Sequence, residues 1–157
     1  MNLISFDNIL KEPNGYLDDI TKNGFQELMD GEKIYSHVQP RGDNDEFSKF
    51  VLDLFRNYTV KWNVIVESWV SSFEGMSGDI IAVLSLSDNQ EYVAALEICD
   101  EQGDVLNMAF PKFNRMIAFT SDTDETKDAI YGFIKNQTGG VSHIIFLEED
   151  KWAKKLN

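Results

Sequence analysis

Few side chains of this sequence could do covalent or metal chemistry, and they lie far apart along the chain. The sequence holds two histidines, His37 and His143, and one cysteine, Cys99. Cys99 and His143 could form a nucleophile–base pair only if the fold happened to bring them together. Cys99 lies in an apolar strand pattern, so we interpret it as a small buried hydrophobe. The sequence also lacks a glycine-rich phosphate loop and a Gly-x-Ser-x-Gly elbow.

Carboxylates are far more abundant, and several of them cluster in short polar segments. Glu74 and Asp79 flank one tight connection, and four more share a later segment: Asp122, Asp124, Glu125 and Asp128. Paired carboxylates can do acid–base work or hold Ca²⁺. The Asp122-x-Asp124 spacing lacks the rest of a calcium loop, so solvated loop acids are the commoner explanation. We therefore expect no metal, no cofactor and no catalytic residue from these motifs.

The excess of acidic residues is the strongest compositional feature. Asp and Glu number 27 against 14 Lys and Arg, which gives a formal net charge of −13. Such a charge repels nucleic-acid phosphates and anionic membranes, so we expect no direct nucleic acid binding and no membrane contact. A protein partner with a basic surface is the natural counterpart, although acidity can also serve only to keep a protein in solution.

Length and patterning predict one domain over residues 1–157. No apolar run approaches the roughly 18–20 residues that a membrane span needs. The first residues lack the basic start and the apolar stretch of a signal peptide. A single cysteine cannot form an internal disulfide. We therefore expect a reducing, cytoplasmic location.

Helical segments are expected mainly within residues 13–57. The spacing of apolar residues after the turn at Pro13 predicts a helix over residues 16–29. Gly24 weakens this prediction, because glycine is unfavourable inside a helix. A clearer helix follows a capping segment at 43–46. Its apolar residues recur on one face: Phe47, Phe50, Val51, Leu54 and Phe55.

Strands at short spacing are expected over residues 59–148. We predict them at 60–73, 79–86, 92–99, 105–110, 116–119, 129–134 and 141–147, after earlier strands at 3–10 and 34–39. The segment 110–121 is typical of a turn, at Pro111, that leads into a buried strand. A charged tail follows at 149–157. This order predicts an α+β fold, a jelly-roll sandwich with the N-terminal helices packed on one sheet.

The order of elements resembles the double-stranded β-helix of iron- and 2-oxoglutarate-dependent oxygenases, especially the prolyl-hydroxylase-like branch. Four segments carry the resemblance: Phe6-Asp7-Asn8-Ile9-Leu10 before Pro13, residues 76–86 as the strand after the first metal-ligand turn, residues 111–119 as a proline-then-strand segment, and Tyr131-Gly132 with residues 142–146 as closing strands. The resemblance spans residues 6–148 and implies a double-stranded β-helix (jelly-roll).

The residues that this family uses for chemistry are missing from the matching positions. Such oxygenases hold Fe(II) with two histidines and one carboxylate, the first two as His-x-Asp or His-x-Glu. Here His37 is followed by Val38 and Gln39, and neither 70–76 nor 121–126 contains a histidine. In the last strand, where the family grips the 2-oxoglutarate carboxylate with a basic residue, the nearest candidates are Ser142 and His143. The resemblance therefore implies a degenerate member, a pseudo-oxygenase without its metal ligands.

These features favour a non-catalytic acidic protein-binding module, not an enzyme, which regulates or inhibits a larger machine such as a protease, nuclease or polymerase. A viral or mobile-element origin would suit that role. Its candidate partner-binding residues are loop acids and one tail tryptophan: Asp100, Glu101, Asp104, Asp122, Asp124, Glu125, Asp128 and Trp152. Trp62 and Trp69 are expected in the core. Two alternatives stay open, an Fe(II)/2-oxoglutarate-dependent oxygenase with an atypical site and a structural or assembly protein.

Overall fold

The computed structural model describes residues 2–22, 26–29, 32–36, 45–66, 79–86, 96–99, 105–110, 112–120 and 142–150. Within these ranges it contains two helices, α1 (Pro13–Thr21) and α2 (Glu46–Leu54). The strands are β1 (Asn2–Phe6), β2 (Gln26–Met29), β3 (Glu32–Ser36), β4 (Tyr58–Val66), β5 (Ile80–Ser85), β6 (Leu96–Cys99), β7 (Val105–Ala109), β8 (Met116–Thr120) and β9 (Ser142–Glu149). The structure confirms the expected mixture of helices and antiparallel sheet.

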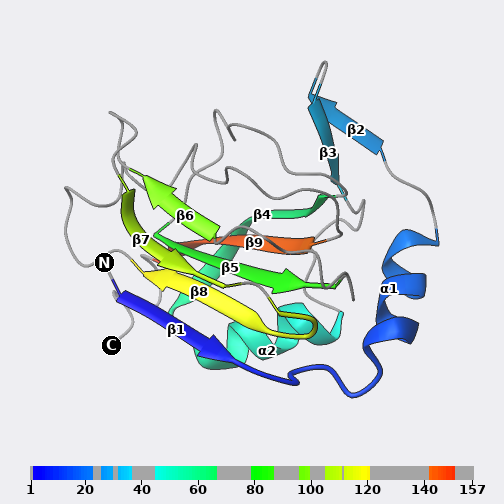
Figure 1. Ribbon diagram of the computed structural model, residues 1–157, viewed down its shortest axis with the longest axis horizontal. Helices are drawn as coiled ribbons and strands as arrows, with labels where there is room; N and C mark the ends of the chain where they lie inside the picture. Colours follow the sequence, from blue (N-terminus) through cyan, green and yellow to red (C-terminus); the bar gives the residue numbers. More distant parts are fainter. Residues whose placement is uncertain are drawn as a thin grey trace.

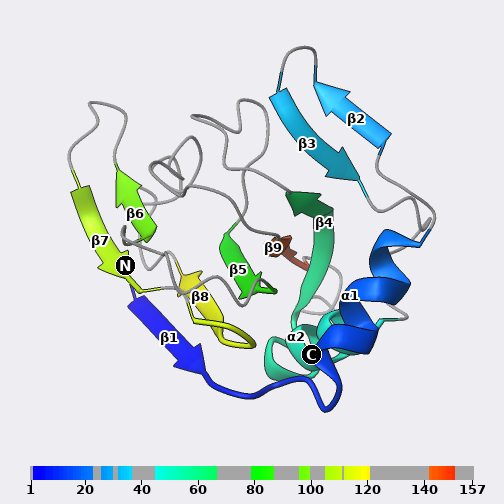
Figure 2. The same cartoon turned by 45° about the vertical axis from the view of Figure 1, so that its right-hand side comes forward.

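Seven of these strands form one sheet in the order β1-β8-β5-β9-β4-β3-β2 (Figure 1). All of its neighbouring strands run antiparallel. β6 and β7 pair with each other as a separate two-stranded sheet. Figure 2 shows α1 and α2 on one side of the large sheet and β6–β7 on the other. The central strands therefore have one face toward the helices and one face toward the smaller sheet.

Local sequence explains where the two helices begin. Pro13 opens α1, and its fixed φ suits the first helical position, where no backbone donor is needed. Asp45 caps α2 by accepting a hydrogen bond from the backbone N–H of Ser48 at 2.7 Å. Glu46 lies in the first turn of α2, where its charge complements the helix dipole.

The core between the sheet and the helices follows the predicted periodicity of α2. Phe47 and Val51 are fully buried against the large sheet. Their sheet partners are every second residue of the central strands: Ile65, Ile80, Ala82, Leu84, Met116, Ala118, Ile145 and Leu147. The expected apolar face is only partly buried, however, because Leu54 near the helix end is 38% exposed. Burial of these apolar side chains is what holds α2 on the sheet.

Two sequence expectations are wrong in the described residues. The helix predicted over 16–29 ends at Thr21, and Gln26–Met29 is a strand because it pairs antiparallel with β3. Trp62, expected in the core, is 38% exposed. A register shift between Val60 and Trp62, where β4 pairs with β9, interrupts the regular alternation of this strand just before the tryptophan. The predicted strand over 129–134, Trp69 and the tail from residue 151 lie outside the described residues.

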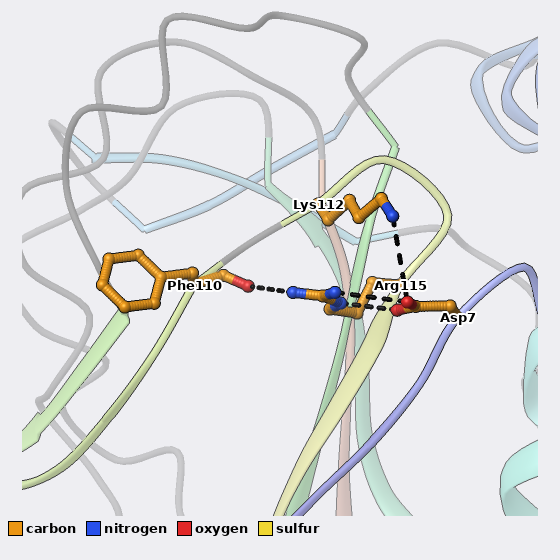
Figure 3. Close-up of polar contacts among 4 residues, drawn as sticks. All are labelled: Asp7, Phe110, Lys112 and Arg115. Atoms are coloured by element: carbon orange, nitrogen blue, oxygen red, sulfur yellow. Dashed lines mark hydrogen bonds and ion pairs between the residues drawn. The ribbon is translucent and has the colours of Figure 1, made fainter.

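The predicted turn and buried strand within 110–121 are confirmed over residues 112–120. Asn114 has a left-handed backbone (φ 61°), and its side chain binds the backbone of Leu10 twice. Arg115 donates to both carboxylate oxygens of Asp7, at 2.5 and 3.2 Å, and to the carbonyl of Phe110 at 3.1 Å (Figure 3). The neighbouring Arg115 guanidinium lowers the pKa of Asp7. These contacts join the turn before β8 to the segment that follows β1.

No helix in the described ranges is long and apolar enough to span a membrane.

Candidate functional site

The predicted partner-binding residues cannot be placed, because all eight lie outside the described residues: Asp100, Glu101, Asp104, Asp122, Asp124, Glu125, Asp128 and Trp152. Their role stays a prediction. The backbone of Cys99 lies in β6, and His37 falls outside the described ranges. Of the residues singled out for chemistry, Ser142 and His143 lie in the described strand β9. They point to opposite faces of the sheet, because successive side chains of a strand alternate.

His143 faces the helices and is 1% exposed. Its ring stacks on the ring of Tyr16 from α1, at 5.9 Å between centroids and 20° between planes. The ring of Phe47 from α2 meets it edge-on at 5.0 Å. The imidazole therefore lies between both helices and the sheet.

Five polar side chains close a hydrogen-bonded ring around this histidine, which we call the polar ring. Its members are Tyr16, Asp45, Ser48, Asn63 and His143. The Tyr16 hydroxyl donates to Asp45 Oδ1 at 2.8 Å and lies 2.7 Å from His143 Nδ1. His143 Nε2 contacts Asn63 Oδ1, and Asn63 Nδ2 donates to Ser48 Oγ at 3.3 Å. Ser48 Oγ completes the ring by donating to Asp45 Oδ2 at 2.8 Å.

The polar ring connects four elements by hydrogen bonds in a partly buried setting. Burial raises the pKa of Tyr16 far above its ordinary value, and the adjacent Asp45 carboxylate raises it further. The phenol therefore stays protonated and donates its hydrogen bond to Asp45. Because Asp45 also caps α2, the same carboxylate fixes the start of α2 and its contact with α1.

The polar ring has a direct consequence for metal binding. Both ring nitrogens of His143 already have side-chain partners, Tyr16 and Asn63, on the helix side of the sheet. The chain has only one other histidine, His37. In the described part of the chain, no three His, Cys, Asp or Glu side chains gather in a way that could hold a metal ion. The described residues therefore do not form a centre built from two histidines and one carboxylate, and His37 lies outside them.

The opposite face of the large sheet carries two buried hydroxyls among apolar residues. Ser85 in β5 and Ser142 in β9 are directly opposite each other in the register of these neighbouring strands. They are 0% and 1% exposed, and neither Oγ has a hydrogen-bond partner in the structure as described. The buried residues that continue this face are apolar: Val64, Ile81, Val83, Ile117, Phe119, Ile144 and Phe146.

Sequence reasoning singled out Ser142 and His143 and placed the cap of α2 within 43–46, but it missed Tyr16, Ser48, Asn63 and Ser85. Ser142 was identified through the matching position in the last strand, and the alternation of β9 places it on the face opposite the helices. Ser85 ends an otherwise apolar strand, which is a signal that could have marked it. Tyr16, Ser48 and Asn63 carry no motif, because only the tertiary fold brings them to His143.

Comparison with known proteins adds information on the fold alone. No protein-family model and no curated protein sequence matches this chain. Among solved structures, it is similar to the viral collagen prolyl hydroxylase of Paramecium bursaria Chlorella virus 1 in its 2OG complex, with a TM-score of 0.63 and 10% identity. That match covers 94% of this chain and 96% of the other. A truncated form of the same hydroxylase matches with a TM-score of 0.54, also at 10% identity, over 94% and 89% of the two chains.

The likeness supports the distant resemblance inferred from the order of elements. It also corrects the expected function. The interpretation as a non-catalytic regulator or inhibitor is wrong, because the neighbours are forms of a prolyl hydroxylase and favour the alternative of an oxygenase-like fold.

Proposed function

We propose that this chain is an oxygenase-like enzyme with an atypical site, which binds a small organic oxo acid between its two sheets. In this proposal the seven-stranded sheet and β6–β7 are the two sheets of a jelly-roll. The observation that carries it is the strand order β8-β5-β9-β4 facing a separate β6–β7 pair. The likeness to a prolyl hydroxylase in its 2OG complex, over nearly the whole chain, supports placing the ligand between these two sheets.

The chain's own residues divide the work between the two faces of the large sheet. On the helix face, the polar ring and the apolar core fix α1 and α2 to β4 and β9. On the other face, apolar side chains such as Val83 and Ile144 exclude water, and Ser85 and Ser142 offer the polar atoms. A buried apolar surface with a few placed polar groups is the usual form of a small-molecule site.

The site is atypical because His143 belongs to the polar ring. A metal bound by this chain would have at most His37 as a histidine ligand and would otherwise depend on carboxylates. Oxygen-rich ligand sets suit Mn(II) and Mg(II) better than sites rich in imidazole do. We therefore assign no reaction step to iron.

The direct test of this function is oxygen uptake. The purified chain is supplied with Fe(II) or Mn(II) and with 2-oxoglutarate or another small 2-oxo acid, and dissolved oxygen is followed with an electrode. Uptake that requires the protein, a metal and the oxo acid together supports the proposal. Uptake no faster than that of heat-denatured protein with every combination contradicts it.

A further inference from the structure

Ser85 and Ser142 form a matched pair at the ends of two central strands. The register of β5 and β9 pairs them directly, so their Cβ atoms point to the same face of the sheet at neighbouring positions. The backbone of Ser85 is bonded: its N–H donates to the carbonyl of Arg115 at 3.2 Å, and its carbonyl accepts from the N–H of Asn114 at 2.8 Å. Among the buried side-chain atoms described, the hydroxyl oxygens of Ser85 and Ser142 are the ones without a hydrogen-bond partner.

Two unpartnered hydroxyls in a buried sheet are unusual, because nearly all buried polar groups have hydrogen-bond partners. Such a group costs free energy that an alanine or valine at the same position would avoid. Ser48 shows the ordinary case, since it is equally buried but binds both Asp45 and Asn63. The contrast indicates that the partner of the Ser85–Ser142 pair lies outside the described residues.

The surroundings of the pair select for an uncharged partner. Along β5 and β9 the next residues on this face are Val83 and Ile144, both fully buried and apolar. Among the buried residues described on this face there is no lysine or arginine. Burying a carboxylate without a cation is strongly unfavourable, whereas a hydroxyl can pair a neutral carbonyl at little cost. The net charge of −13 adds a general repulsion against dianions.

We infer that the Ser85–Ser142 hydroxyl pair binds the uncharged polar end of the ligand, a ketone, ester or amide carbonyl, and not a carboxylate. This inference rests on the proposed function and names its ligand class: a 2-oxo acid whose far end is neutral. It differs from the expectation of the resemblance, in which a basic residue of the last strand grips the second carboxylate of 2-oxoglutarate. Ser142 occupies β9 where that charge would be expected.

The first test uses the ligand-free protein. Ser85→Ala and Ser142→Ala are compared with Ser48→Ala as the matched control for a buried but bonded serine. Thermal unfolding should leave the first two variants as stable as the unchanged protein or more stable, and should show Ser48→Ala to be less stable. Destabilisation of all three variants by similar amounts would overturn the inference, because the pair would then be bonded within the chain.

The second test compares two probes that differ only at the far end, 2-oxoglutarate and its 5-methyl ester. Isothermal titration without oxygen, in the presence of Mn(II), should give an affinity about tenfold or more higher for the ester. Ser142→Ala should remove that preference, while Ser48→Ala retains it. Tighter binding of the dianion would overturn this inference and leave the proposed function standing. Binding of neither probe would overturn the inference, and absence of oxygen uptake would separately contradict the function.

Discussion

Tyr16 and His143 lie 127 residues apart in the sequence, yet the Tyr16 hydroxyl is 2.7 Å from His143 Nδ1 and the two rings stack. This contact joins α1 to β9 and forms one side of the polar ring. The polar ring bonds both ring nitrogens of His143 on the helix face of the sheet. His143 therefore helps to hold the helices, and the ligand site that we propose lies on the opposite face.

Removing the Tyr16 hydroxyl should weaken the whole protein. Tyr16→Phe removes one hydrogen bond from Asp45 and the Tyr16 contact of His143 Nδ1, while Asp45 keeps Ser48 and His143 keeps Asn63. We therefore expect a loss of about 1–3 kcal/mol in the free energy of unfolding. Urea unfolding followed by circular dichroism measures it. Tyr58→Phe is the control, since Tyr58 is also partly buried but outside the polar ring. Equal losses in the two variants would contradict a special role for Tyr16.

The raised pKa of Tyr16 predicts a loss of stability in alkali. The folded state holds the phenolic proton above the ordinary pKa of 10.0, while the unfolded chain releases it near that value. Stability is therefore complete below pH 10 and falls as pH rises beyond it, by up to about 1.4 kcal/mol per pH unit for this one proton. Urea midpoints between pH 9 and 11 test this. Tyr16→Phe should show a shallower decline, and an identical slope would exclude the assignment.

Metal binding should distinguish the two histidines. His143→Gln keeps a polar side chain and removes the imidazole, so we expect a less stable protein whose affinity for Mn(II) is unchanged. His37→Gln should reduce that affinity if the chain binds Mn(II) through a histidine. Titration calorimetry at a temperature where both variants are folded provides the comparison. A large fall in affinity for His143→Gln alone would show that the polar ring opens to supply a ligand.

Asn114 offers a test of the contact between the turn before β8 and the segment that follows β1. Its side chain bonds both the N–H and the carbonyl of buried Leu10, at 3.0 and 2.9 Å, and its φ is positive. Asn114→Ala should cost about 2–4 kcal/mol, because two backbone groups lose partners. Asn114→Gly should cost about 1 kcal/mol less, since glycine accepts the left-handed backbone without strain. Equal losses would show that backbone conformation contributes nothing here.

Local periodicity predicted the elements whose own residues determine them. The spacing of Phe47 and Val51 predicted α2, and the apolar run at 116–119 predicted β8. β2 was missed because its strand state depends on pairing with β3, which no local pattern records. The order of helices and strands was enough to suggest the oxygenase-like fold, because that order reflects the topology of the sheets.

The two sites were harder to predict for a physical reason. The members of the polar ring come from α1, the start of α2, β4 and β9. No sequence motif links these residues to one another. Ser85 and Ser142 become a pair only through the register of β5 and β9. His143 was considered as a base beside Cys99 and as a candidate for the basic residue of the last strand, but its direction depends on the alternation of β9, which places it toward the helices.

The most direct test of the account is a thermal-shift titration of the chain and its Ser85→Ala/Ser142→Ala double variant. The probe is the 5-methyl ester of 2-oxoglutarate with Mn(II), under anaerobic conditions. The account predicts that the ligand stabilises the unchanged chain and the Ser48→Ala control by several degrees, and the double variant by much less. Equal stabilisation of the double variant, or no stabilisation of the unchanged chain, would contradict a ligand site between the sheets.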